Sequence, residues 1–470
     1  MTRRVIPLAL FLSLLFVFQV FAQVDPGVRG GGAAAGGPLS SVAANNPVTI
    51  LNFFNDAKVR FQEIDSVSGS LAGENGFGLG PRFNSRSCAA CHAQPAVGGT
   101  APAVNPQVAD ATAHGATNTI PSFITSSGPV REARFPFFFT NNQPDPNRPN
   151  GGVEDLYTIV GRVDAPASCN TSVIVQPSFT LAVNTGNIIF RIPTPTFGTG
   201  LMENMPDLAL QANLTTTHVF PVSGRLNTSG NDGTVTRFGW KAQNKSLMVF
   251  AGEAYNVEQG VSNEAFGNER AAVAGCVFNG SPEDTTKMLD DQNSSTGTAA
   301  EMSSDLVNFA AFMRFSSPPV PGAMSGSATN GANLFNAVGC GLCHTATLTT
   351  GKSKFSGMSS VPYHPYSDFA IHHMGSRLAD GVSQGAAGPD QFRTAPLWGL
   401  GQRLFFLHDG RTSDLLQAIQ AHASDCGNSR FRFGGNTSQS CGSEANDVIR
   451  RFNSLNRSQM QDVLNFLRSL

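Results

Sequence analysis

Two short motifs in this chain combine paired thiols with an imidazole. They are Cys88-Ala89-Ala90-Cys91-His92 and Cys340-Gly341-Leu342-Cys343-His344. Two thiols three positions apart can add to the two vinyl groups of one haem, and the following His can then bind the iron. A zinc knuckle would need further Cys or His at close spacing, and a redox dithiol would not need the His. We therefore expect two covalently attached haem c groups, with the His of each motif as an iron ligand.

The N-terminus predicts export. Arg3 and Arg4 precede an apolar run over residues 5–21, which ends at Ala22 with the small or apolar residues typical of a signal-peptidase site. The alternative is a membrane anchor, although the run is barely long enough to span a bilayer. Residues 1–22 are therefore interpreted as a signal peptide and residues 23–48, rich in Gly and Ala, as a flexible tether. The mature protein is expected to be periplasmic or secreted.

The four remaining cysteines are Cys169, Cys276, Cys426 and Cys441. In an oxidising compartment pairing is the default, and three pairings are formally possible. Cys426 with Cys441 would close a short loop rich in Gly, Ser and Asn, and Cys169 with Cys276 would then staple the middle of the chain. The sequence alone does not choose among the pairings.

Length and charge limit the classes of protein that the chain can represent. Its 470 residues are too many for one small domain and predict two or three. With 31 basic against 33 acidic residues there is no basic excess to hold a phosphate backbone. We therefore expect no nucleic-acid partner. Beyond the signal no stretch approaches a membrane-spanning helix, so no stable span is expected in the mature chain.

An internal repeat indicates that the two motifs belong to duplicated halves. In each half a Phe-Arg dipeptide is followed, after a short gap, by the pattern Pro-x-aromatic-Gly-x-Gly. The first copy begins at Phe190-Arg191 and ends at Gly200, and the second begins at Phe392-Arg393 and ends at Gly401. A second correspondence relates Trp240, followed seven positions later by Leu247, to His408, followed seven positions later by Leu415. The intervals in the first half are longer by about 50 and about 33 residues, so this half carries two insertions.

These observations predict a mainly α protein with two cytochrome c-like haem domains in tandem. The N-terminal domain would cover residues 49–300, with loop and β insertions at about 120–235, and the C-terminal domain residues 301–470. Short helices are expected around residues 331–335 and over 456–470, the latter capped by Asn456 with Gln459 at the reciprocal position. In the insertion, β-branched residues and alternation predict strands at 171–175, 179–183 and 187–192.

The combined motifs resemble the bacterial di-haem cytochrome c peroxidases and, more closely, the di-haem oxidoreductase family often labelled thiol-oxidoreductase-like. The segments that carry the resemblance, besides the two Cys-x-x-Cys-His motifs, are residues 237–243, 368–375, 392–401 and 407–411. They cover both halves, from about residue 50 to the end. The resemblance implies that the C-terminal haem is a high-potential electron port and that peroxide meets the N-terminal haem.

The resemblance also suggests a second ligand for the iron of the port haem. Met374, in the segment His372-His373-Met374-Gly, is the candidate, because a thioether raises the potential of a haem. His372 and His373 are weaker alternatives. In the peroxidases a distal Met or Tyr comes just before the Phe-Arg-Thr segment, where this chain has Asp390 and Gln391.

At the peroxide-binding haem the resemblance implies an acid and an electron relay. Glu258 falls where the relatives carry the acid that helps to cleave the O–O bond, although Phe250 replaces their upstream Gln. Trp240 matches a Trp between the two haems, and good packing is the alternative explanation for it. His114 could cap the resting iron or could simply be a surface residue.

His408 and Arg411 are candidates for contacts with haem propionates, since an Arg fork suits a carboxylate; a polar turn is the alternative. The expected function is an exported di-haem oxidoreductase of cytochrome c peroxidase type. Its partners would be a small redox protein or quinol-chain electron donor, and peroxide or a small oxidisable substrate. A di-haem electron-transfer protein without substrate chemistry and a haem-dependent oxygenase are the alternatives. The relatives often carry a calcium ion between domains, but no local loop here demands one.

Overall fold

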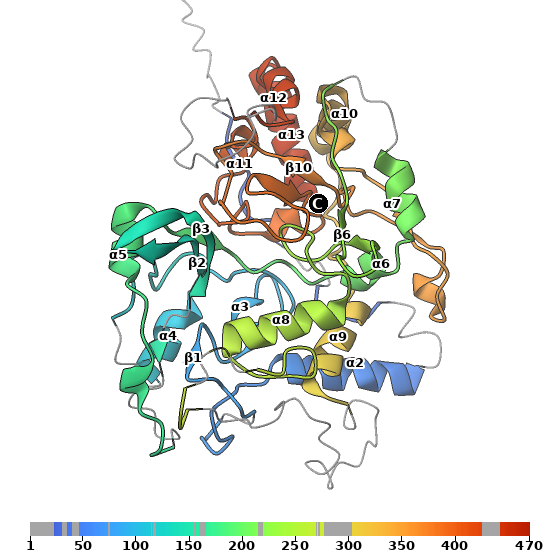
Figure 1. Cartoon of the computed structure of the whole chain (residues 1–470). Coiled ribbons are helices and arrows are strands. Elements are labelled where there is room, and N and C mark those ends of the chain that lie inside the picture. The colour runs from blue at the N-terminus through green and yellow to red at the C-terminus, as the bar shows by residue number, and fades with distance from the viewer. Residues whose placement is uncertain are drawn as a thin grey trace, which may run out of the picture.

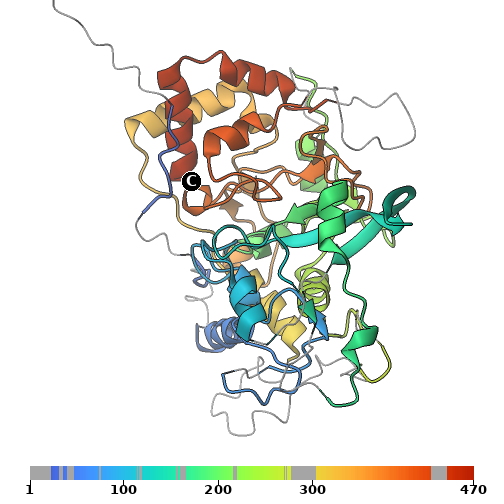
Figure 2. The ribbon, with the colours of Figure 1, turned by 90° about the vertical axis from the view of Figure 1, so that its left-hand side faces the viewer.

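The computed structural model describes residues 23–30, 35–39, 47–73, 76–113, 115, 119–154, 157–158, 166–214, 220–268, 270, 273–276, 303–424 and 442–470. The expected signal peptide, His114, Cys426 and Cys441 lie outside these residues. Two groups of helices stand apart in Figures 1 and 2, one at each end of the molecule. Within the described residues, every helix is too short or too polar to span a membrane.

The first group of helices forms the core of the N-terminal half. Its members are α2 (Pro47–Phe61), α6 (Thr199–Glu203), α8 (Leu247–Gln259) and α9 (Asp305–Phe315). Aromatic side chains of α2 and α9 interdigitate, and Phe61 contacts both Phe309 and Phe312. Helix α8 is defined at both ends, because the Ser246 side chain accepts from the Val249 amide and Gly260 closes the helix with a positive φ of 72°.

The second group forms the core of the C-terminal half. It contains α10 (Gly326–Val338), α11 (Leu415–Gln420), α12 (Asn446–Asn453) and α13 (Arg457–Ser469). The helix expected at the C-terminus is confirmed, with both hydrogen bonds of a capping box between Asn456 and Gln459. Its apolar stripe packs against α10, where Phe335 meets Phe466 at a ring distance of 5.4 Å.

The two halves repeat the same packing device. Gly200 and Gly401 each lie where a helix backbone leaves no room for a side chain. A Cβ on Gly200 would lie 1.9 Å from the Arg314 carbonyl oxygen of α9, and one on Gly401 would lie 2.0 Å from the Arg468 carbonyl oxygen of α13. Helix α9 therefore has the place in the first half that α13 has in the second. Helix α9 packs mainly on α2, and the domain boundary expected near residue 300 stays a prediction.

The first insertion builds a three-stranded antiparallel sheet in the order β3-β2-β5. Its strands are β2 (Glu132–Thr140), β3 (Gln143–Glu154) and β5 (Ile189–Arg191), and the β2–β3 hairpin projects to the left in Figure 1. The register places Glu132 opposite Arg191. The strand expected at 187–192 is therefore confirmed.

Two other strands expected in this insertion are wrong. Residues 179–183 lie in α5 (Phe179–Thr185), because Ser178 caps its N-terminus and Gly186 closes its C-terminus in the left-handed region. These capping signals outweigh the β-branched alternation. Residues 171–173 form a single 3₁₀ turn, η1 (Thr171–Val173). The disulfide between Cys169 and Cys276 is present and ties the insertion to the chain beyond α8.

The remaining elements are short. They are β1 (Arg82–Phe83), α3 (Cys88–Cys91), α4 (Pro106–Ala113), β4 (Tyr157–Thr158), α7 (Asp207–Leu214), β6 (Asn227–Thr228), β7 (Val235–Thr236), η2 (Cys340–Leu342), β8 (Leu348–Thr349), η3 (Ser356–Met358), β9 (Pro362–Tyr363), β10 (Ile371–His373), β11 (Gln391–Arg393) and η4 (Leu400–Gln402). Helix makes up 33 % and strand 15 % of the structure, so helix predominates as expected. The tandem cytochrome c-like arrangement stays a prediction.

The described part of the expected tether does not hang free. Asp25 forms an ion pair of 2.6 Å with Arg468 of α13, and the Arg29 amide donates to the Gly401 carbonyl at 2.7 Å. Gly and Ala give this segment little side-chain bulk, so its backbone can lie close to the C-terminal half.

Candidate di-haem site

Each Cys-x-x-Cys-His motif forms one tight helical turn. In α3 the His92 amide donates to the Cys88 carbonyl at 3.0 Å, and after η2 the His344 amide donates to the Cys340 carbonyl at 3.0 Å. One turn brings the two thiols and the imidazole of a motif to the edge of the same cavity. None of the four cysteines forms a disulfide, so all four sulfur atoms are free to react.

Both motif imidazoles are oriented by the backbone. His92 Nδ1 lies 3.0 Å from the Gly99 carbonyl oxygen, and His344 Nδ1 lies 2.9 Å from the Tyr366 carbonyl oxygen. A carbonyl only accepts, so Nδ1 carries the proton and Nε2 is left with a free lone pair. Burial lowers the pKa of His344 to about 4 and also lowers the pKa of His92. Both rings are thus neutral, which is the state and orientation of a metal-binding His.

The cavity at the second motif is large and mostly apolar. It has about 1410 Å³ of space between atoms, a figure that includes its open mouth. Leu, Val, Ile and Phe side chains from α10, α11, α12 and α13 line it. Four imidazoles and one thioether also face it, from His344, His372, His408, His422 and Met374.

Two buried guanidinium groups border this cavity without a carboxylate partner among the described residues. Arg393 donates to the Gly239 and Thr394 carbonyls, and Arg403 donates to the Pro396 carbonyl at 2.7 Å. Burial lowers the pKa of each to about 10. An uncompensated buried charge is costly, and the propionates of a haem would supply the missing negative charge. These residues fit a haem at this cavity.

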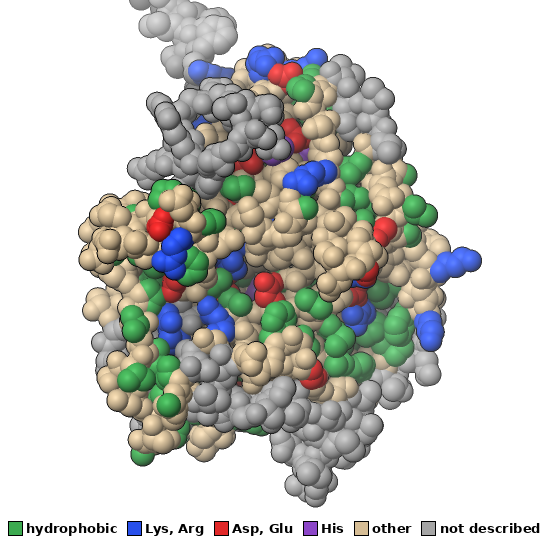
Figure 3. Space-filling view, viewed as in Figure 1, with side chains coloured by type: hydrophobic (Ala, Val, Ile, Leu, Met, Phe, Trp, Pro, Cys, Tyr) green, Lys and Arg blue, Asp and Glu red, His purple; other side chains and the backbone are tan. Residues whose placement is uncertain are grey.

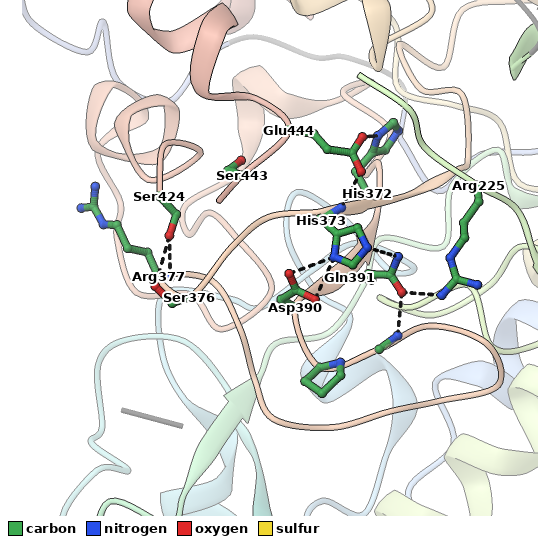
Figure 4. A network of polar contacts seen from close by, with 12 residues as sticks. Arg225, His372, His373, Ser376, Arg377, Asp390, Gln391, Ser424, Ser443 and Glu444 are labelled. Carbon is green, nitrogen blue, oxygen red and sulfur yellow. Dashed lines mark hydrogen bonds and ion pairs between the residues drawn. The ribbon is translucent and has the colours of Figure 1, made fainter. Parts of the chain in front are cut away.

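His372 and His373 are already engaged with carboxylates (Figure 4). His372 contacts Asp368 at 3.0 Å and Glu444 at 2.8 Å, while His373 lies 3.0 Å from Asp390. Burial opposes a charge on His372, but the Cys343 sulfur and its bonds to these acids raise its pKa well above the usual value. Both imidazoles are thus held by carboxylates in this structure, and a role of either one as the second iron ligand stays a prediction.

The cavity at the first motif has a different chemistry. It has about 1190 Å³ of space between atoms, and His92 is the only imidazole that faces it among the described residues. Polar groups are numerous instead. The acids, amides and guanidinium groups on its wall include Asn84, Gln107, Glu132, Arg134, Arg191, Gln243, Glu253 and Glu258. Phe250 borders the same cavity from α8.

Glu258 faces this cavity beside a second carboxyl group. One carboxylate oxygen, Oε2, accepts from the Asn84 side chain at 3.0 Å, and the carboxyl group also forms a hydrogen bond with Glu132. Burial, and then the neighbouring charge of Glu132, raise the pKa of Glu258 well above its usual value. Arg134 and Arg191 lower the pKa of Glu132 against the effect of burial, so Glu132 is the charged partner. These opposite shifts favour the protonated form on Glu258 and the charged form on Glu132.

Glu132 and its neighbours on the insertion were not found from the sequence. Glu132 comes from β2, and only the pairing of β2 with β5 brings it beside Arg191 and towards Glu258. No local motif marks Glu132. Arg191 did carry a signal, because the repeated Phe-Arg dipeptide pairs it with Arg393, and each of these buried arginines faces one of the two cavities.

Trp240 borders both cavities. Its indole Nε1 donates to the Ile192 carbonyl at 2.9 Å, which fixes the ring, and the ring lies 6.4 Å from that of His408. His408 in turn stacks on Phe392 at 4.3 Å. The structure thus brings Trp240 and His408, the two equivalent positions of the repeat, into contact at the junction of the halves.

Charged groups reinforce this junction. The buried Lys241 ammonium lies 3.0 Å from Asp380, which also binds Arg191 at 2.7 Å. These contacts join residues of the first half to a loop of the second. Arg411, by contrast, faces neither cavity: its guanidinium binds Asp409 and donates to the Arg377 carbonyl. A role for Arg411 at a propionate is not supported by this placement.

The chain belongs to the di-haem oxidoreductase family. Residues 148–468 match the family described as "Di-haem oxidoreductase, putative peroxidase". Both cavities fit its haems, since each presents two thiols, an oriented neutral imidazole and buried guanidinium groups. No curated protein matches the chain.

Two solved structures show similarity to this chain. Hydrazine synthase from Kuenenia stuttgartiensis is 14 % identical, with 37 % of this chain and 59 % of that chain covered and a TM-score of 0.23. A MauG-like protein associated with microbial copper homeostasis is 16 % identical, with 59 % of this chain and 90 % of that chain covered and a TM-score of 0.28. The chain thus spans less than two thirds of the hydrazine synthase chain.

Proposed function

We propose that this protein is an exported di-haem c-type oxidoreductase that reduces peroxide at its N-terminal haem and receives electrons at its C-terminal haem. The observation that carries the proposal is the chemical difference between the two cavities. One has several potential iron ligands in an apolar wall, which suits electron transfer. The other has a single described imidazole and a proton-holding carboxyl pair, which suits bond cleavage.

Reduction of one hydrogen peroxide to two waters consumes two electrons and two protons. The haem supplies the redox chemistry when it is bound. Glu258, whose raised pKa favours its protonated form, would donate a proton to the leaving oxygen, and Glu132 beside it, whose pKa is lowered, can accept a proton for the next turnover. Arg134 and Arg191 stabilise the negative charge that develops when the proton leaves the pair.

Trp240 is proposed as the relay between the haems, because it is the aromatic side chain of the first half that borders both cavities and touches His408. The four motif cysteines would hold the haems as thioethers, with His92 and His344 as iron ligands. Met374, the second ligand that the resemblance suggests, faces the port cavity. Calcium between the domains stays a prediction from the resemblance.

The electron donor is proposed to be a small redox protein or a quinol-chain component. On the face in Figure 3, acidic and basic side chains of the described residues are interspersed, without a continuous basic area. Export to the periplasm or the medium rests on the N-terminal sequence.

The test is electron paramagnetic resonance of the oxidised and half-reduced holoprotein, followed by titration with hydrogen peroxide. We expect one haem with an exchangeable or open iron position in at least one of these states, and consumption of peroxide with an external reductant. Two inert six-coordinate haems in both states would favour an electron-transfer protein. Consumption of dioxygen with an organic substrate, and none of peroxide, would favour an oxygenase.

A further inference from the structure

His422 shares with the two motif imidazoles an arrangement that other described histidines lack. It follows helix α11, and its Nδ1 lies 2.8 Å from the Ala418 carbonyl oxygen one turn earlier. The bond fixes the proton on Nδ1 and turns Nε2 towards the cavity of the second motif. His92 and His344 have the same combination of a backbone-bound Nδ1 and a free Nε2.

The segment around His422 is held firmly. Asp414 caps α11 through the Gln417 amide at 2.8 Å, and the His422 amide donates to the Ile419 carbonyl at 3.1 Å. Just beyond, the Asn446 side chain bonds both the amide and the carbonyl of Ser424, at 2.9 and 3.0 Å. The imidazole is thus presented from a rigid element, as a metal ligand must be.

Among the described residues, the hydrogen-bond partners of the His422 ring are the backbone carbonyls of Ala418 and Ile419. Ala418, Ile419 and Val448 line the same cavity as His422, and His344 lies within electrostatic reach of its ring. A metal in the cavity would satisfy the lone pair of each imidazole.

The structure assigns His422, rather than Met374, as the residue that would give the second protein ligand to the iron of a haem held by the motif of His344. This assignment rests on the di-haem part of the proposed function. Met374 faces the same cavity, but a thioether in an apolar wall is satisfied without a ligand role. His408 also lines the cavity, but its ring stacks on Phe392 and lies within electrostatic reach of Asp409 and Asp380. A haem propionate could accept a hydrogen bond from its ring nitrogen there.

The decisive measurement is near-infrared magnetic circular dichroism of the oxidised wild-type holoprotein, which separates imidazole–imidazole from imidazole–thioether ligation. We expect no thioether-ligated haem. His422→Ala should convert one of the two haems from low spin to high spin, while Met374→Leu and the surface control His364→Ala should leave the spectrum unchanged. Haem content of two per chain shows that each variant has assembled.

A thioether band in the wild type, lost in Met374→Leu, would overturn the assignment. So would a low-spin spectrum unchanged in His422→Ala. If that variant does not assemble, the wild-type spectrum alone decides. Peroxide turnover takes place at the other haem, so the proposed function can hold even if the ligand assignment fails. Conversely, a protein with the expected ligation but no peroxide turnover would contradict the proposed function and leave the ligand assignment intact.

Discussion

Replacing Glu258 by Gln tests the acid at the first cavity with little change of shape. The amide can still contact Asn84 and Glu132, but it cannot deliver a proton. Proton transfer by a positioned side chain contributes about 10²–10⁴ to rate, which corresponds to roughly 2.7–5.4 kcal/mol of barrier at about 1.36 kcal/mol per factor of ten. We therefore expect kcat/KM for hydrogen peroxide to fall by two to four powers of ten, as this estimate gives.

The assay is steady-state oxidation of a reduced electron donor by peroxide over a range of pH. The neutral form of Glu258 is the proton donor, so wild-type activity should fall as pH rises through the raised pKa of the carboxyl pair. The variant should lack this limb. Glu264→Gln, which removes an exposed carboxylate just beyond α8, is the matched control and should retain the wild-type profile.

Stability supplies an independent readout. The folded chain keeps the Glu258 proton above the pKa of about 4.5 that an unfolded Glu has, so in that range the folded state binds more protons. The free energy of unfolding contributed by this group therefore decreases as pH rises above that value and levels off above its raised pKa. The slope should be smaller in the Gln variant. Turnover within threefold of wild type, with the pH limb intact, would refute the acid role.

Three further changes test other parts of the structure. Trp240→Phe removes the indole hydrogen bond, so it should slow electron transfer between the haems in stopped-flow reduction and cost about 0.5–1.5 kcal/mol of stability; an unchanged rate would remove the relay. Gly401→Ala should destabilise by roughly 1–3 kcal/mol in urea unfolding, because its Cβ meets the backbone of α13, while Gly326→Ala, with open space around it, should not. Replacing Cys169 and Cys276 by Ser should cost about 2–5 kcal/mol, since the bond closes 107 residues, and reductant should then have no further effect.

Local chemistry was the part of the site that the sequence could predict. The motif imidazoles and thiols meet at one cavity because a single turn connects them, and the capping box of α13 is likewise a local feature. The strand expected at 179–183 failed because Ser178 and Gly186, which flank the run, define a helix. Glu132 was missed for a different reason: its neighbours come from β5 and α8, which are distant along the chain.

The repeat shows how the two cavities came to differ. Arg191 and Arg393 occupy equivalent positions, as do Trp240 and His408, so the shared scaffold supplies a buried cation and an aromatic junction to each half. Glu132 is the register partner of Arg191, whereas the register partner of Arg393 in the second half is the apolar Ile371. The insertion therefore supplies the negative partner that keeps a proton on Glu258, and it does so at one cavity only. If this reasoning is right, Glu132→Gln should lower the pKa that governs activity, since removing the neighbouring charge eases ionisation of Glu258, while the spectrum of the C-terminal haem stays as in the wild type.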